Sequence, residues 1–144
     1  MRRALGVSAN LHDVTLADMN GDGYLDVLLA TDGGGVSRLW INDGAANFAL
    51  DNRGYDSSEP TFKQLVVDVD QDGDLDIVEC NGVGQINRLF ENDGSGNFVP
   101  GMDFALTDGS HGGGAFGDFD GDGDVDFLFA SPSASGLSDT ALNH

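Results

Sequence analysis

Basic residues are scarce in this sequence. Lysine and arginine together number 6, against 25 aspartate and glutamate residues, and the 144-residue chain has a formal net charge of −19 at pH 7. A phosphate backbone would be repelled by such a charge, and an anionic membrane surface is disfavoured for the same reason. We therefore expect no nucleic-acid binding and no membrane insertion.

Cysteine is almost absent as well. The single Cys80 excludes an internal disulfide framework. It aligns with Ala30 and Ala130 in the repeat described below, so a small buried side chain is expected there rather than a reactive thiol. The sequence also lacks any apolar stretch long enough to cross a membrane. Its start at Met1 is basic but has no apolar run behind it, so either an export signal lies outside these residues or that route is not used.

The acidic residues are concentrated in three copies of one loop. The copies begin at Asp18, Asp68 and Asp118, with a spacing of 50 residues both times, and read DMNGDGYLD, DVDQDGDLD and DFDGDGDVD. The similarity extends beyond the loop, because RLWINDG at 38–44 matches RLFENDG at 88–94. A fixed period of this length is typical of solenoids, propellers and arrays.

The pattern predicts an all-β fold made of three four-stranded propeller-type blades. Short β-rich runs bounded by turn residues fill each unit, and no window has a convincing helical period. The expected units are 1–50, 51–100 and 101–144, and the third is incomplete because it has no counterpart of the strand at 97–99. The expected strands are 14–17, 25–30, 37–41 and 47–50, then 65–67, 75–80, 87–91 and 97–99, and finally 114–116, 125–130 and 139–142.

Each loop is predicted to bind Ca²⁺ between the first two strands of its blade. Calcium prefers six to eight oxygen ligands from carboxylates, carbonyls and water. Alternate side chains at positions 1, 3 and 5 turn their oxygens inward, glycine at position 6 permits the turn, position 7 offers its carbonyl, and position 9 adds a carboxylate. Without a cation, so many neighbouring carboxylates would repel one another. The candidate ligands are Asp18, Asn20, Asp22, Tyr24 and Asp26; Asp68, Asp70, Asp72, Asp74 and Asp76; and Asp118, Asp120, Asp122, Asp124 and Asp126.

Other readings of the loops fit less well. Residues 68–79 satisfy the EF-hand pattern, with Glu79 at position 12. The other copies have Leu29 and Phe129 at that position, and β-type residues follow each loop where an EF-hand requires a helix. Magnesium prefers rigid octahedra. Transition metals are disfavoured because the loops contain no histidine or cysteine.

The ordered motifs resemble the FG-GAP/VCBS-type repeat family, which is also found in integrin α-subunit heads. They are Asp-x-Asp/Asn-x-Asp-Gly-x-x-Asp, then Arg-Leu-Trp/Phe, then Asn-Asp-Gly-x-x-Asn-Phe. The resemblance implies β-propeller blades, often seven to a ring, with a calcium loop between the first two strands. It implies that positions 1, 3, 5 and 9 of each loop are ligands, and that the protein is extracellular or at the cell surface.

The expected function is a non-catalytic, calcium-stabilised module for binding, adhesion or self-assembly. Three blades cannot close a ring, so exposed edges and blade faces should favour association with further copies or with a protein or glycan ligand. One alternative is a lectin, in which Trp40 and Phe90 stack on sugars, although packing between blades is the expected role of both. Another is an accessory domain or fragment of a sugar-active enzyme, but the carboxylates outside the loops form no catalytic constellation.

Five polar side chains are assigned no special role. The histidines His12, His111 and His144 have no metal-type spacing. Arg38 and Arg88 occupy equivalent positions, where an inter-strand ion pair or a solvated strand face is expected rather than a ligand contact.

Overall fold

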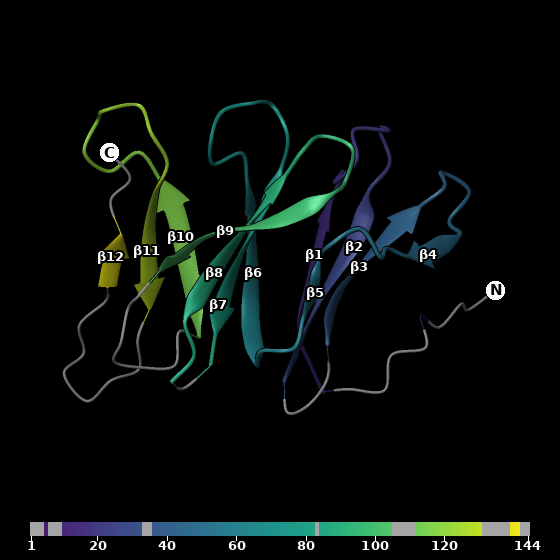
Figure 1. Ribbon diagram of the computed structural model, residues 1–144, viewed down its shortest axis with the longest axis horizontal. Helices are drawn as coiled ribbons and strands as arrows, with labels where there is room; N and C mark the ends of the chain where they lie inside the picture. The colour runs from purple at the N-terminus through teal and green to yellow at the C-terminus, as the bar shows by residue number, and fades with distance from the viewer. Residues whose placement is uncertain are drawn as a thin grey trace.

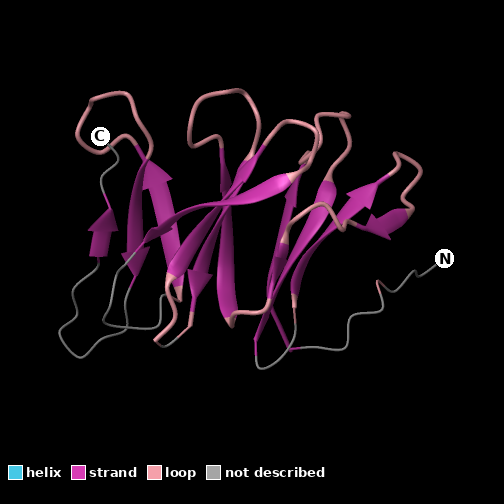
Figure 2. Ribbon diagram, in the orientation of Figure 1, coloured by secondary structure: helices cyan, strands magenta, loops and turns pink. Residues whose placement is uncertain are grey.

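The chain folds into three antiparallel sheets that lie side by side in sequence order (Figure 1). The computed structural model describes residues 5, 10–32, 36–82, 84–104, 112–130 and 139–141. These residues form twelve strands and no helix, so the fold is all-β (Figure 2). Accordingly, no helix capable of spanning a bilayer is found in the described part of the chain.

The three sheets share one topology, in which successive strands pair with their neighbours. The first sheet contains β1 (Asn10–Ala17), β2 (Asp26–Asp32), β3 (Ser37–Asn42) and β4 (Phe48–Leu50), with β5 (Asp56–Ser57) also paired to β3. The second contains β6 (Thr61–Val67), β7 (Asp76–Asn81), β8 (Asn87–Asn92) and β9 (Phe98–Phe104). The third contains β10 (Gly113–Gly117), β11 (Asp126–Ala130) and β12 (Asp139–Ala141).

The predicted strands are present, with ends displaced by a few residues. The largest extensions are at β1, β6 and β9, where pairing continues past the apolar runs that marked the strands in the sequence. The segment β5 was not expected. The stretch 131–136, Leu142, His111 and His144 lie outside the described residues.

Apolar side chains of adjacent sheets interlock in two separate cores. Between the first and second sheets, the buried residues are Ala17, Met19, Leu28, Leu39, Tyr55, Ile77, Phe90 and Phe98. Between the second and third sheets, they are Leu65, Val67, Val78, Cys80, Leu89, Phe104, Phe127 and Phe129. Because successive side chains of a strand point to opposite faces, each inner strand of the second sheet contributes to both cores. Cys80 is fully buried, as predicted from its alignment with alanines.

The segment 51–55 explains why the outer strand is split in the first sheet and continuous in the second. Leu50 and Pro100 pair with equivalent residues, but five residues separate Leu50 from Asp56, whereas two separate Pro100 from Asp103. The extra chain reaches the second sheet, where the Arg53 carbonyl accepts a hydrogen bond of 2.9 Å from the Phe98 amide. Tyr55 then enters the core with an exposed fraction of 1%. The first sheet is thereby tied to the second by main-chain as well as apolar contacts.

The three aspartate-rich loops lie along one edge of the molecule. Each loop connects the first two strands of its sheet, so all three project from the same end of the sheets, at the top of Figure 1. The β3–β4 and β8–β9 turns lie at this edge too. The fold therefore places the candidate ligands together with the two turns of the Asn-Asp-Gly motif.

Candidate cation loops

The aspartate at position 9 fastens each loop to the sheet. The Asp26 side chain is fully buried, and its two carboxylate oxygens accept hydrogen bonds from the amides of Met19 (2.9 Å) and Asn42 (2.8 Å). Asp76 repeats the arrangement with the amides of Val69 and Asn92, both at 2.8 Å. A single carboxylate at the start of the second strand thus binds both the beginning of the loop and the end of the third strand of the same sheet.

Asp126 follows the same pattern in the third loop. Its side chain is fully buried, and its carboxylate accepts a hydrogen bond of 2.8 Å from the Phe119 amide, the counterpart of Met19 and Val69. Position 9 therefore has a structural role that the repeat pattern did not reveal, because the pattern predicted only a metal ligand there.

The buried carboxylates lie in an environment that disfavours their charged form. Burial is the main cause that raises the pKa of Asp26 above its usual value, and the neighbouring Asp22 and Asp18 carboxylates raise it further, while the two amide hydrogen bonds lower it. The pKa of Asp76 is raised in the same way, by burial first and then by Asp70 and Asp72. A cation near these groups would remove the repulsive part of this cost.

The aspartate at position 1 closes the loop. The two carboxylate oxygens of Asp18 accept hydrogen bonds from the amides of Asp22 (3.1 Å) and Gly23 (2.7 Å). Asp68 makes the same pair of contacts with Asp72 (3.1 Å) and Gly73 (3.0 Å). These contacts turn the chain through position 6, where Gly23, Gly73 and Gly123 have φ values of 88°, 100° and 98° that favour glycine.

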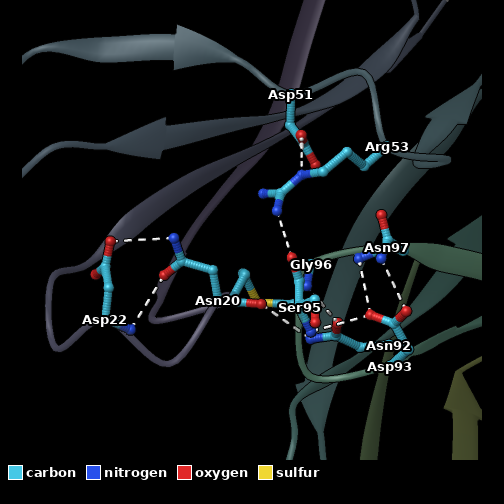
Figure 3. Close-up of polar contacts among 10 residues, drawn as sticks. Asn20, Asp22, Asp51, Arg53, Asn92, Asp93, Ser95, Gly96 and Asn97 are labelled. Atoms are coloured by element: carbon cyan, nitrogen blue, oxygen red, sulfur yellow. Dashed lines mark hydrogen bonds and ion pairs between the residues drawn. The ribbon is translucent and has the colours of Figure 1, made fainter.

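Side chains at positions 3 and 5 fold back over the loop. In the first loop, Asn20 accepts from the Asp22 amide at 3.2 Å, and its side-chain amide donates to the Asp22 carboxylate at 3.0 Å (Figure 3). The Asp22 carboxylate also accepts from the Tyr24 amide at 2.9 Å. The corresponding main-chain contacts recur in the second and third loops.

The carboxylates at positions 1, 3 and 9 converge in the second and third loops. Asp68, Asp70 and Asp76 each offer an oxygen, and these oxygens lie within 4.8 Å of one another; Asp118, Asp120 and Asp126 form an equal set. Oxygens that bind one calcium ion at about 2.3–2.6 Å cannot lie more than about 5 Å apart, so both sets fit that ion. The first loop has the amide of Asn20 in place of the second carboxylate.

The remaining candidate ligands are placed differently. Asp72 and Asp122 at position 5 are outside these close sets. At position 7, the ring of Tyr24 packs against Gly44 in the β3–β4 turn, and the carboxylate of Asp74 lies against Gly94 in the β8–β9 turn. Coordination by positions 5 and 7 stays a prediction, as does coordination by positions 1, 3 and 9.

Two asparagines of the Asn-Asp-Gly turns support the loops. The side-chain amide of Asn42 donates to the Leu25 carbonyl at 3.0 Å, and that of Asn92 donates to the Leu75 carbonyl at 3.1 Å. In the sequence, both positions stand out only as members of the repeated Asn-Asp-Gly motif. Their recurrence at a fixed distance after each loop was the available signal, but the contact with the loop could not be inferred from spacing alone.

Glu79 does not belong to the second loop. It lies on strand β7, so the helix that an EF-hand requires is not present there. Its fully buried carboxylate accepts hydrogen bonds from the Tyr55 hydroxyl (2.8 Å) and the Ser57 hydroxyl (2.7 Å). The EF-hand reading is thereby excluded.

Three of the side chains weighed in the sequence for other roles have structural contacts. Phe90 has an exposed fraction of 5% and packs edge-to-face on Tyr55, with ring centroids 5.1 Å apart. Arg88 forms a cross-strand ion pair with Asp103 at 3.0 Å, as expected. His12 lies 3.3 Å from the Asp32 carboxylate.

Comparison with known proteins gives one positive result. A family model described as FG-GAP-like repeat matches the chain twice, at residues 18–79 and 68–129. The two matches overlap and together include all three loops. No curated protein matches the chain significantly.

Proposed function

Because this chain belongs to the family of FG-GAP-like repeats, we propose that it is a non-catalytic, calcium-stabilised module of β-propeller-type blades that serves binding or adhesion outside the cell. The repeats of this family typically occur in extracellular or surface modules for adhesion or ligand binding, and they are generally non-catalytic. Calcium binding and the propeller arrangement are the parts of the proposal that go beyond family membership.

The convergence of buried and exposed carboxylates carries the proposal. In each of the second and third loops, one buried aspartate and two others bring oxygens within 4.8 Å. The buried member is fixed by main-chain amides, so it cannot turn away from the others to relieve the repulsion. Calcium would be held by positions 1, 3 and 9, and its charge would offset that repulsion.

Calcium would act on stability and would not take part in a reaction. At a concentration ten times the Kd, each site would add about 1.4 kcal/mol to the free energy of unfolding. Three sites would contribute a large part of the stability of a small domain. The loops would fasten the first three strands of each blade through positions 1 and 9.

Calorimetric titration of the chain with CaCl₂ tests the calcium proposal. We expect binding at the loops, and a melting temperature that falls by many degrees when EGTA is added in the presence of Mg²⁺. Asp70→Asn should weaken binding because it removes a charge but keeps the acceptor for the Asp72 amide. Glu59→Gln, which alters a carboxylate outside the loops, serves as the control. An unchanged melt in EGTA, with no heat on titration, would exclude the proposed role of calcium.

We further propose that this chain associates through the outer face of its first sheet, with a second copy as the partner. On this face, Val14 and Leu16 both have an exposed fraction of 56% and lie opposite Leu29 and Val27. The equivalent face of the second sheet, which includes Val66 and Ile77, packs against the first sheet. The outer face of the first sheet is thus equivalent to the face through which the second sheet packs against the first.

The complementary surface is the face of the third sheet that no other described sheet covers. Leu128 is 37% exposed there, whereas its counterparts Leu28 and Val78 are fully buried by the following sheet. Phe119 is 51% exposed, whereas its counterpart Met19 is 1% exposed. A second copy that adds its third sheet to the first sheet would repeat the packing already present twice in the chain.

The mass in solution, measured by light scattering in millimolar calcium, tests the association. We expect a mass above that of the monomer that increases with protein concentration, and a monomer for Leu16→Glu. Val99 is equally exposed at 56% but lies on the outer strand β9, so Val99→Glu should leave the mass unchanged. A monomeric wild-type chain at high concentration would exclude this association and leave the calcium proposal intact.

A further inference from the structure

Asn92 connects the first and second loops. Its side-chain amide donates hydrogen bonds to two carbonyls, that of Met19 in the first loop at 2.9 Å and that of Leu75 in the second loop at 3.1 Å. Its main-chain amide donates to the Asp76 carboxylate at 2.8 Å. Asn92 is 5% exposed, so water competes little for these contacts.

The connection continues to the buried aspartate of the first loop. The amide of Met19 donates to the Asp26 carboxylate, while its carbonyl accepts from Asn92. A chain of three hydrogen bonds therefore joins Asp26, Met19, Asn92 and Asp76. The position 9 carboxylates of two loops, 50 residues apart in sequence, are its two ends.

Gln71 connects the second and third loops. Its side-chain amide donates to the Gly123 carbonyl at 2.9 Å and to the Asp124 carboxylate at 3.2 Å. Gln71 has a φ of 61°, in the left-handed region, where the other two loops have Gly21 and Gly121. A non-glycine residue in this conformation is uncommon, and here its side chain spans the gap to the next loop.

We propose that these two side chains couple the loops, so that cation binding to one loop increases the affinity of its neighbour. This inference rests on the calcium binding proposed above. A cation that orders one loop fixes its end of the hydrogen-bonded chain, and the neighbouring loop then loses less conformational freedom when it binds. Coupling of this kind is reciprocal, so each loop of a connected pair raises the affinity of the other by the same factor.

Site-resolved titration of the whole chain separates coupling from simple support of each loop. The probe is Ca²⁺ alone, and the amide signals of Gly23, Gly73 and Gly123 in two-dimensional NMR report the three loops separately. The third loop is disabled by Asp118→Asn together with Asp120→Asn, because asparagine keeps the acceptor oxygens. We expect this change to lower the affinity of the second loop about three- to tenfold, the range for about one net hydrogen bond.

Gln71→Gly provides the decisive comparison. Glycine stands at this position in the other two loops, so the variant keeps the backbone conformation and removes only the link. In this background, disabling the third loop should leave the affinity of the second unchanged. If disabling the third loop changes the Ca²⁺ affinity of the second loop equally in the wild type and in Gln71→Gly, or changes it in neither protein, coupling through Gln71 is excluded.

A matched pair of asparagines tests the other link. Asn42 makes the same contacts within its own loop as Asn92, with the Leu25 carbonyl and Asp26. Asn42→Ala should therefore weaken the first loop but preserve its coupling to the second, whereas Asn92→Ala should abolish that coupling. If the loops bind Ca²⁺ independently of one another, the coupling proposal is wrong but the calcium proposal stands. The absence of calcium binding from every variant, the wild type included, would overturn both proposals.

Discussion

The hydroxyl of Tyr55 donates a hydrogen bond of 2.8 Å to the carboxylate of Glu79, and both side chains are buried between the first and second sheets. Ser57 donates to the other carboxylate oxygen at 2.7 Å, and Gln64 donates to the Tyr55 hydroxyl. The first sheet has Leu29 at the position of Glu79, and the third has Phe129. One of the three equivalent positions is thus occupied by a group that prefers water.

This carboxylate should make stability depend on pH. Burial raises the pKa of Glu79, although hydrogen bonds from Ser57 and Tyr55 oppose the shift. A carboxyl group with a higher pKa in the folded state binds protons more tightly when folded, so its unfavourable contribution develops as the pH rises from the unfolded pKa through the folded pKa. We expect Glu79→Gln to be more stable than the wild type above that range, and the difference to shrink at lower pH. Urea unfolding in saturating calcium across pH 4–8 measures it.

Replacement of Glu79 by the leucine of the first sheet should have the opposite effect. Glu79→Leu would leave the buried hydroxyls of Tyr55 and Ser57 without their acceptor, at a cost of about 1–3 kcal/mol for each group. The free energy of unfolding at pH 7 should therefore fall, even though a buried charge is removed. A leucine variant as stable as the glutamine variant would show that the hydroxyls find other partners.

The first loop should bind calcium more weakly than the other two. It has Asn20 where they have Asp70 and Asp120, and the number of charged ligands tunes the affinity of such sites. Asn20→Asp should strengthen binding at the first loop several-fold, and the Gly23 amide signal can follow it. Equal affinities in all three loops of the wild type would mean that charge at position 3 does not matter.

Loss of a buried position 9 aspartate should destabilise the fold even without calcium. Asp76→Ala would leave the amides of Val69 and Asn92 unpaired in a partly buried environment. We expect a loss of about 2–5 kcal/mol, measured by urea unfolding in EGTA. Asp70→Asn is the matched control, because it reduces the charge at the same cation set but preserves its main-chain contact, and it should cost little in EGTA.

The segment 51–55 provides a prediction about the interface between sheets. Gly54 has a φ of 112°, and a Cβ atom there would overlap the Phe98 carbonyl oxygen. Gly54→Ala should therefore destabilise the chain by about 3 kcal/mol or more, since either the main-chain contact or the packing of Tyr55 must yield. Gly84 has a φ of 74° and open space around it, so Gly84→Ala should cost only about 1 kcal/mol. Equal losses would mean that backbone strain alone, and not the contact with Phe98, explains the effect.

The sequence predicted the strands and loops well because both depend on local patterns that recur every 50 residues. Asp18, Asp68 and Asp118 could be aligned by inspection, and glycine at position 6 marked the turn. The structural role of the position 9 aspartates was missed, because the Asn42 and Asn92 amides that they accept from lie 16 residues away on another strand.

Features that interrupt the repeat were the least predictable. Glu79, Gln71 and the segment 51–55 each depart from the shared pattern, so alignment of the units treats them as exceptions. Each of them makes its main contacts between neighbouring sheets or their loops, and such contacts depend on how the sheets are placed side by side. The sequence alone carries no signal for them.

The network around Glu79 also gives the repeats a fixed order. Two of the hydroxyls that satisfy the Glu79 carboxylate come from Tyr55 and Ser57, in the connection that leads out of the first sheet. A chain in which the second sheet (β6–β9) was moved to another place in the series without residues 51–60 would bury the same carboxylate without them. The three sheets look like interchangeable copies at their loops, but duplication or shuffling of the central sheet would have to bring the preceding connection with it.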